Sequence, residues 1–143
     1  MPMSKMSVAD KLRNAGISPT SQRVEIAHFF LNRRDHLSAD QILEGVNREY
    51  PAVSRGTVYN ALNLLVEKGL VVEVIAAPGK VFYDPNPKPH HHIYFVDRGT
   101  LEDLPESLPF PSQIQLPMEK LKDIPLGPNA WVERVDLVVR VRG

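Results

Sequence analysis

The sequence predicts an α+β fold, with helices in the first half of the chain and short strands in the second. Apolar residues recur at helical spacing between Ser7 and Lys68. A β-branched, apolar run over Leu70–Ile75 follows directly. Ten of the 13 prolines lie at or beyond Pro78, and they favour loops and strands there because proline lacks the amide that a helix needs.

Four helices are expected in the first half, and residues that cap or break helices mark their ends. The expected ranges are Ser7–Asn14, Ser21–Asn32, Ser38–Tyr50 and Ser54–Lys68. Gly16 follows the first helix, and Gly69 closes the fourth as a left-handed cap. The third begins with the capping box Ser38-Ala39-Asp40-Gln41, in which two side chains satisfy free backbone amides, and it stops before Pro51.

A β-hairpin is predicted next, because Leu70–Ile75 and Val81–Tyr83 are strand-like and flank the turn residues Ala76–Gly79. Short helices followed at once by a hairpin is the order of elements in a winged helix. Residues 1–84 are therefore predicted to form a winged-helix DNA-binding domain. The prolines of residues 85–89 exclude a helix or a central strand, which indicates a hinge.

Residues 90–143 are expected to form a small C-terminal α/β domain. Strands are predicted over His90–Val96 and Trp131–Val141. Between them, Leu104–Pro128 reads as a Pro-rich loop with one short helix at Met118–Asp123. Trp131 is expected to be a core or dimer-interface anchor. Because a two-stranded sheet is too small to be stable alone, we expect this domain to dimerise with a second copy of the chain.

The composition excludes several classes of protein. The 143 residues carry 17 Lys and Arg against 17 Asp and Glu, and no apolar run approaches the roughly 20 residues of a membrane span. The first ten residues lack the apolar core of a secretory signal, so we expect a cytoplasmic protein. The absence of cysteine excludes disulfides, thiolate nucleophiles and Cys-based zinc sites, so any metal must be bound by His, Asp or Glu.

The fourth predicted helix has the composition of a DNA-recognition helix. Its buried stripe is Val58, Leu62, Leu65 and Val66. The opposite face carries Arg55, Tyr59 and Asn63, with Asn60 beside them. A guanidinium seeks phosphates, an aromatic ring can contact a thymine methyl, and amides can read adenine edges. Lys80, in the hairpin turn, is a candidate wing contact. A solvated polar face is the alternative interpretation of the same pattern.

The histidine triplet His90–His92 is a candidate metal site. Side chains alternate along a strand, so His90 and His92 share one face and can chelate one cation. Asp84 and Asp103 can add carboxylates, and His36 from the first domain can complete the shell. Such nitrogen and oxygen ligands suit Fe2+, Mn2+ or Zn2+ without selecting among them. The alternative is a solvated loop that happens to be rich in histidine.

The whole pattern resembles the ferric uptake regulator family of metal-responsive repressors. The resemblance depends on four segments: Gly16–Arg23, His36–Asp40, Ser54–Leu62, and Phe82-Tyr83-Asp84 before the histidines. It implies that Tyr59 and Asn60 meet bases, that Arg55 meets the DNA backbone, and that Arg23 lies near the DNA or braces the second helix. It also implies a regulatory metal site made of His36, Asp84, His90, His92 and Asp103.

The chain departs from the common family pattern in ways that indicate which branches of the family it resembles most. It has no Cys pairs, so the structural zinc of many members must be absent. With no cysteine, the triplet His90–His92 and the ending Val135–Arg142, it is most similar to the iron response regulator branch. The histidine triplet of that branch is associated with haem, which implies haem at His90, His91 and His92. The carboxylate of Asp103 resembles the peroxide-sensing branch, in which Fe2+ promotes oxidation of a ligand histidine.

The leading hypothesis is a dimeric repressor that responds to iron, manganese or haem and binds an inverted-repeat operator in double-stranded DNA. Such a repressor would control iron or haem homeostasis or a peroxide response. Its metal would be Fe2+ or Mn2+, with Zn2+ able to bind in vitro. One alternative is a mononuclear non-haem metalloenzyme, since two His and a carboxylate with open positions also form oxygenase sites. Two others are a peroxide sensor and a DNA-binding module whose histidines have no role.

Overall fold

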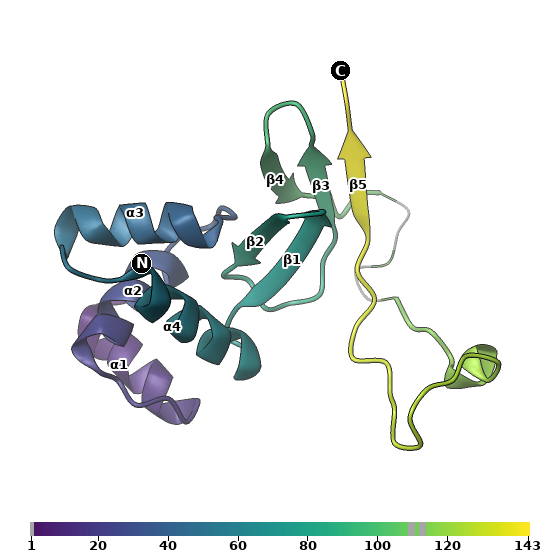
Figure 1. Ribbon diagram of the computed structural model, residues 1–143, viewed down its shortest axis with the longest axis horizontal. Coiled ribbons are helices and arrows are strands. Elements are labelled where there is room, and N and C mark those ends of the chain that lie inside the picture. Colours follow the sequence, from purple (N-terminus) through teal and green to yellow (C-terminus); the bar gives the residue numbers. More distant parts are fainter. Residues whose placement is uncertain (1, 109–110, 112–113) are drawn as a thin grey trace. The chain divides into compact units, whose positions relative to one another are not determined.

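The computed structural model describes residues 2–108, 111 and 114–143, and it divides into two compact units (Figure 1). The first unit is Met1–Pro87 and the second is Lys88–Gly143. The division follows Pro87 and falls in the Pro-rich segment 85–89. Part of the loop expected over Leu104–Pro128, namely residues 109–110 and 112–113, lies outside the described residues.

Four helices form most of the first unit, as predicted. They are α1 (Lys5–Asn14), α2 (Ser21–Leu31), α3 (Ala39–Glu49) and α4 (Arg55–Glu67). Each begins after a Ser or Thr whose side chain accepts a hydrogen bond from the amide three residues on. Helix α1 starts two residues earlier than expected because Ser4 caps it. The capping box of Ser38 and Gln41 is present at α3.

The core of the first unit is built from one face of each helix. Phe30, Ile42 and Leu62 are completely buried in it. On α4 the predicted stripe is buried at Val58, Leu62 and Leu65, Val66 is half-buried, and Ala61 joins the core. Burial of this face leaves the opposite face of α4 at the surface of the unit.

A β-hairpin completes the first unit. Strand β1 (Val72–Ala77) pairs antiparallel with β2 (Lys80–Asp84), from Val72 opposite Asp84 to Ala77 opposite Lys80. Gly79, with φ of +72°, supplies the left-handed residue of the turn. The hairpin starts later than predicted because the amides of Leu70 and Val71 bond the carbonyl of Leu65 and so belong to the end of α4.

One isolated bridge joins the loop between α2 and α3 to the hairpin. The Leu37 amide donates to the Tyr83 carbonyl at 3.2 Å, and the Tyr83 amide donates to the Leu37 carbonyl at 2.7 Å. This pair of hydrogen bonds fixes the residues on either side of Leu37 and Tyr83 against each other.

The second unit is a three-stranded sheet in the order β4-β3-β5, so the expected two-stranded sheet is wrong. Strand β3 (His92–Phe95) pairs antiparallel with β4 (Thr100–Asp103) and parallel with β5 (Val138–Val141) (Figure 1). Strand β4 was not predicted, because only Leu101 of its four residues is buried and no alternation marks it.

The predicted long strand Trp131–Val141 is also wrong over most of its length. Strand β5 occupies only its last four residues, because the four residues of β3 pair with all of them and leave no ladder for the rest. Trp131 is 72% exposed and so is not a core anchor in this chain. The short helix expected at Met118–Asp123 is a 3₁₀ turn, η1 (Met118–Leu121). Within the described ranges, no helix is long and apolar enough to cross a membrane.

The turn between α3 and α4 contains a residue with a strained backbone, Ala52. Ala52 follows Pro51 with φ of +87°, a combination typical of a type II turn whose third residue is usually glycine. In that conformation the Cβ is strained by about 1–2 kcal/mol. Ala52→Gly should therefore raise the free energy of unfolding by about 0.5–1 kcal/mol, after the greater entropy of unfolded glycine is subtracted.

Urea denaturation followed by helix circular dichroism measures this effect. Ala15→Gly is the matched control, since Ala15 caps α1 at φ of −87° and gains no relief. It should lower the free energy of unfolding. Loss of stability in both variants would contradict a strained Ala52.

Candidate metal centre and nucleic-acid interface

The first unit holds a buried histidine–carboxylate pair. His36 precedes Leu37 and Asp84 follows Tyr83, so the antiparallel bridge brings the two side chains together. His36 Nε2 lies 2.9 Å from Asp84 Oδ2, and the residues are 9% and 2% exposed. The backbone amide of Asn86 donates to the other oxygen of Asp84 at 2.9 Å. A carboxylate as buried as this one requires such partners.

A second carboxylate next to this pair is engaged elsewhere. Asp35 accepts hydrogen bonds from Nε and Nη2 of Arg33 at 2.8 and 2.7 Å. The Arg33 guanidinium holds the pKa of Asp35 below its usual range, despite partial burial. Asp35 therefore stays ionised and bound to Arg33, which leaves Asp84 as the carboxylate partner of His36 among these neighbours.

The second unit holds a cluster of His90, His92 and Asp103. Strand pairing places His92 directly opposite Asp103. Asp103 Oδ1 lies 3.1 Å from His90 Nε2 and 3.7 Å from His92 Nε2, and the two imidazole ring centres are 4.5 Å apart. His92 is buried, His90 is half-buried and Asp103 is exposed. The cluster is therefore preformed but open to solvent on the side of Asp103.

The donor set of this cluster fits a divalent cation. Two ligands that are each about 2.1 Å from one ion lie roughly 3.0–3.4 Å apart, and the separations from Asp103 Oδ1 are close to this range. His90 Nδ1 lies 2.5 Å from the Lys88 carbonyl. Because a carbonyl can only accept, Nδ1 is the donor in this contact, and in the neutral imidazole Nε2 is then the atom that can bind a cation.

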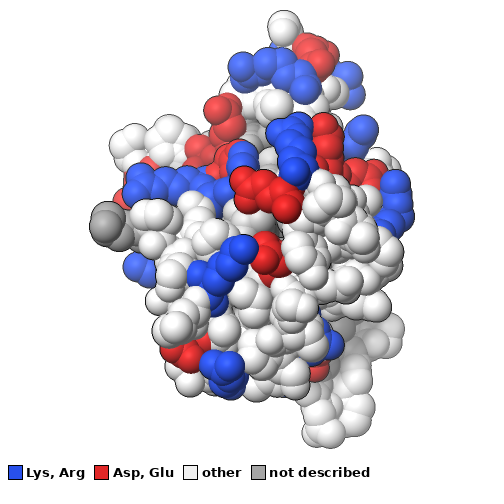
Figure 2. Space-filling model, turned by 90° about the vertical axis from the view of Figure 1, so that its left-hand side faces the viewer, with Lys and Arg blue, Asp and Glu red and all other residues white. Residues whose placement is uncertain are grey.

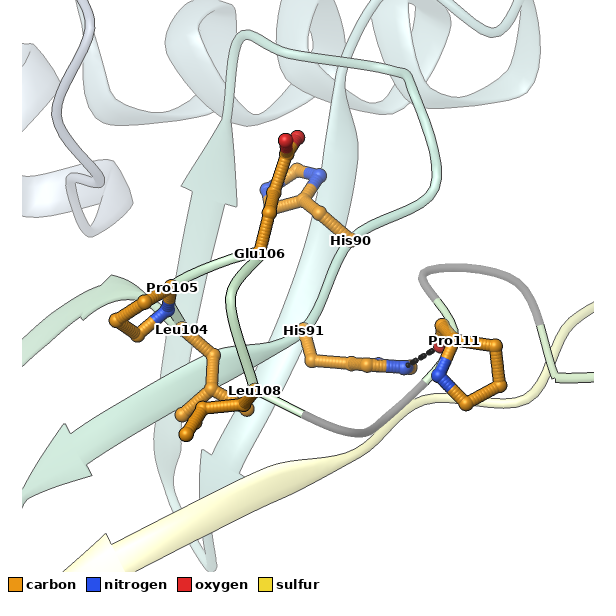
Figure 3. A pocket seen from close by; sticks show the side chains of 7 residues that line it. All are labelled: His90, His91, Leu104, Pro105, Glu106, Leu108 and Pro111. Carbon is orange, nitrogen blue, oxygen red and sulfur yellow. Dashed lines mark hydrogen bonds between the residues drawn. The ribbon is translucent and has the colours of Figure 1, made fainter.

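His91 points toward Pro111 and away from His90 (Figure 3). Its Nε2 donates to the Pro111 carbonyl at 2.6 Å, so Nδ1 is the nitrogen without a proton when the imidazole is neutral. Nδ1 is buried and has no hydrogen-bond partner within the described part of the chain. His91 also lines a cavity of about 350 Å³ together with His90, Glu106 and Leu104 among others. The lining of this cavity is therefore partly polar and partly apolar.

The side chains predicted to meet DNA lie at the surface of the first unit. On α4, Arg55, Tyr59, Asn60 and Asn63 are exposed, as is Lys80 in the hairpin turn. Arg23 donates from Nη1 to the Ser18 carbonyl at 3.1 Å, so it braces the start of α2. On the face in Figure 2, Lys and Arg side chains lie among Asp and Glu side chains and form no single basic patch.

Sequence reasoning missed one residue of this surface, Asp40. Its Oδ1 lies 2.7 Å from Arg55 Nη1, so the cation at the start of α4 already has an anionic partner. The two residues are on different helices, and no sequence spacing relates them. Only the packing of α3 against α4 brings them together.

Known proteins share both the sequence and the fold of this chain. The model of the ferric uptake regulator family matches residues 14–108. The peroxide-responsive repressor PerR of Staphylococcus aureus (strain Mu50) is 32% identical over 92 residues, which cover 64% of this chain. The chain spans 62% of the length of that curated relative.

Two solved structures are similar over nearly the whole chain. The ferric uptake regulator from Pseudomonas aeruginosa with manganese has a TM-score of 0.66 at 23% identity, covering 94% of this chain and 96% of that one. The Campylobacter jejuni peroxide stress regulator has a TM-score of 0.61 at 27% identity, covering 99% and 97%. These likenesses confirm the predicted fold class. Because the family model also matches more than half of its residues, the chain belongs to the ferric uptake regulator family.

Proposed function

We propose that this protein is a metal-responsive transcriptional repressor that binds operator DNA as a dimer. The observation that carries the proposal is the combination, in one chain, of an exposed recognition face on α4 with preformed His and Asp donors. The family and the relatives it matches are regulators, which favours this function over the metalloenzyme. A repressor needs these side chains only to bind a metal and DNA reversibly, without catalysing a reaction.

The regulatory metal site in this proposal combines the donors of both units. Its ligands are His36 and Asp84 from the first and His90, His92 and Asp103 from the second. Asp84 and His90 flank the connecting residues 85–89, so the chain itself keeps the two donor sets close in sequence. Fe2+ and Mn2+ are the physiological candidates, and Zn2+ also fits imidazole and carboxylate ligands. When bound, a divalent cation supplies the positive charge that holds carboxylates and imidazoles in one shell.

The response follows from what these residues do. Sharing one cation between both donor sets would restrict the connection at residues 85–89 and favour the conformer in which the recognition helices of a dimer reach successive major grooves. Such coupling typically amounts to about 1–3 kcal/mol. The hydrogen bonds from Asn86 to Asp84 and from His90 to Lys88 orient two of the ligands in advance.

The second unit is the dimerisation surface in this proposal. Strand β5 is an edge of the three-stranded sheet. The exposed large apolar residues of this unit include Leu116, Ile124, Leu126, Trp131 and Val141. Exposed sheet edges and apolar side chains favour pairing with another chain. Trp131 is then an interface anchor.

Haem is a second candidate effector because of His91. A buried imidazole nitrogen without a partner, beside a partly apolar cavity, is suited to bind a ligand of that kind. In this alternative, His91 provides the binding nitrogen while His90 and His92 serve the cation site with Asp103.

Removing the carboxylate of Asp103 tests the cation site. Asp103→Asn should lower the affinity for Mn2+ at least about tenfold, because one anionic ligand becomes neutral. Electron paramagnetic resonance of free Mn2+ during titration of the full chain measures this. Glu102→Gln is the matched control, since the neighbouring side chain points to the other face of β4 and carries the same charge. Equal affinities for the two variants would argue against the site.

Tyr59→Ala tests the recognition face. The probe is a DNA duplex selected from a random library by the wild-type protein with Mn2+. Tyr59 is exposed, so its loss should weaken binding about tenfold while dimerisation and Mn2+ affinity stay unchanged. Met6→Ala removes an exposed apolar side chain from α1 and should leave DNA binding unchanged. Unaltered DNA binding by the Tyr59 variant would show that the exposed face of α4 is not the surface that contacts DNA.

His91→Phe separates the haem alternative from the cation site. The substitution keeps a ring at that position and removes Nδ1. If haem uses His91, titration of the wild type should give a saturable Soret shift that this variant loses, while its Mn2+ affinity is retained. Persistence of the shift in the variant would exclude His91 as the haem ligand.

A further inference from the structure

The ion pair between Asp40 and Arg55 is unusual in its position on the molecule. Arg55 is the first residue of α4, and Asp40 lies in the first turn of α3. Asp40 Oδ1 and Arg55 Nη1 are 2.7 Å apart, and the two side chains are 63% and 64% exposed. An ion pair so exposed to water adds little to the stability of a fold.

The location of Arg55 is electrostatically special. The first turn of a helix carries partial positive charge, which disfavours a cation there and favours an anion such as a phosphate. The ion pair with Asp40 neutralises this cation on the face that also carries Tyr59 and Asn63. The formal net charge of the chain is zero, so each cation neutralised in this way further weakens the attraction of the chain to DNA.

We infer that Asp40 is a specificity-determining residue that suppresses binding to incorrect DNA by holding Arg55. This inference rests on the proposed DNA-binding function. Any DNA phosphate near α4 meets the carboxylate of Asp40 and is repelled by it. Only a duplex that places a phosphate against Arg55, while Tyr59 and its neighbours meet matching bases, offsets that repulsion.

The geometry allows this role without breaking the pair. The contact uses one nitrogen of the guanidinium, Nη1, whereas a guanidinium has five N–H donors. Its other donors can bind a phosphate while Nη1 stays with Asp40. In the correct complex Asp40 positions the guanidinium against the phosphate, which offsets its repulsion of that phosphate. In an incorrect complex Asp40 contributes the repulsion alone.

The test compares two duplexes and two variants of the full chain with Mn2+. One duplex comes from the pool selected by the wild type, and the other has random sequence. Asp40→Asn keeps the shape of the side chain and removes its charge. Asp10→Asn is the matched control: Asp10 pairs with Arg13 at 2.8 Å on α1, with the two side chains similarly exposed at 64% and 60%. Fluorescence anisotropy over a range of salt concentrations gives affinity and salt slope.

For Asp40→Asn we expect binding to the random duplex to strengthen about fivefold for each copy of the first unit that contacts the DNA. This factor corresponds to the upper range of the free energy of one exposed ion pair. The salt slope should steepen by about 1 for each such unit, which a merely structural role would not produce. Binding to the selected duplex should change by less than about twofold. Asp10→Asn should match the wild type on both duplexes.

Three results would overturn the inference. Asp40→Asn could behave like Asp10→Asn, it could strengthen both duplexes equally, or it could weaken the selected duplex as strongly as Tyr59→Ala does. These outcomes concern Asp40 alone when the wild type binds its selected duplex. Failure of the wild type to select any duplex would overturn the proposed function as well.

Discussion

The bridge between Leu37 and Tyr83 is the interaction on which the functional surface of the first unit depends. Its two backbone hydrogen bonds bring His36 against Asp84. The same short segment then caps α3 at Ser38 and presents Asp40 to Arg55. His36, a donor of the proposed metal site, and Asp40, the partner of a cation in the proposed DNA interface, thus lie within five consecutive residues. This gives a short covalent path between the two proposed functions.

Charge on this chain is arranged in local pairs. Several exposed cations on the first unit are matched by carboxylates at 2.7–2.9 Å, as for Lys5 with Glu25 and Arg48 with Glu44. A protein with its charges paired in this way would gain little from bulk attraction to DNA, so in the proposed function its affinity must come from correctly placed contacts. The pair of Asp40 with Arg55 applies the same principle on the recognition face itself.

The second unit gathers its three histidines where β3 begins, because His90 and His91 directly precede the strand and His92 is its first residue. His90 and His92 lie against Asp103, where solvent reaches the carboxylate, whereas His91 donates to the Pro111 carbonyl beside a partly apolar cavity that His90 also lines. The sheet that carries them is small, and its short strands leave Trp131 exposed. Burial of that apolar surface by a second copy would stabilise both the sheet and the site it holds.

The sequence by itself determined the helices, because their caps and apolar spacing are local, and it determined which side of α4 is buried. It also indicated that His90 and His92 lie together, and their ring centres are 4.5 Å apart although His90 precedes β3. Only the tertiary structure decided that β4 pairs with β3, that β5 is short and that Asp40 meets Arg55. These features depend on which segments lie side by side, and a strand or an ion pair exists only where a partner is within hydrogen-bond reach.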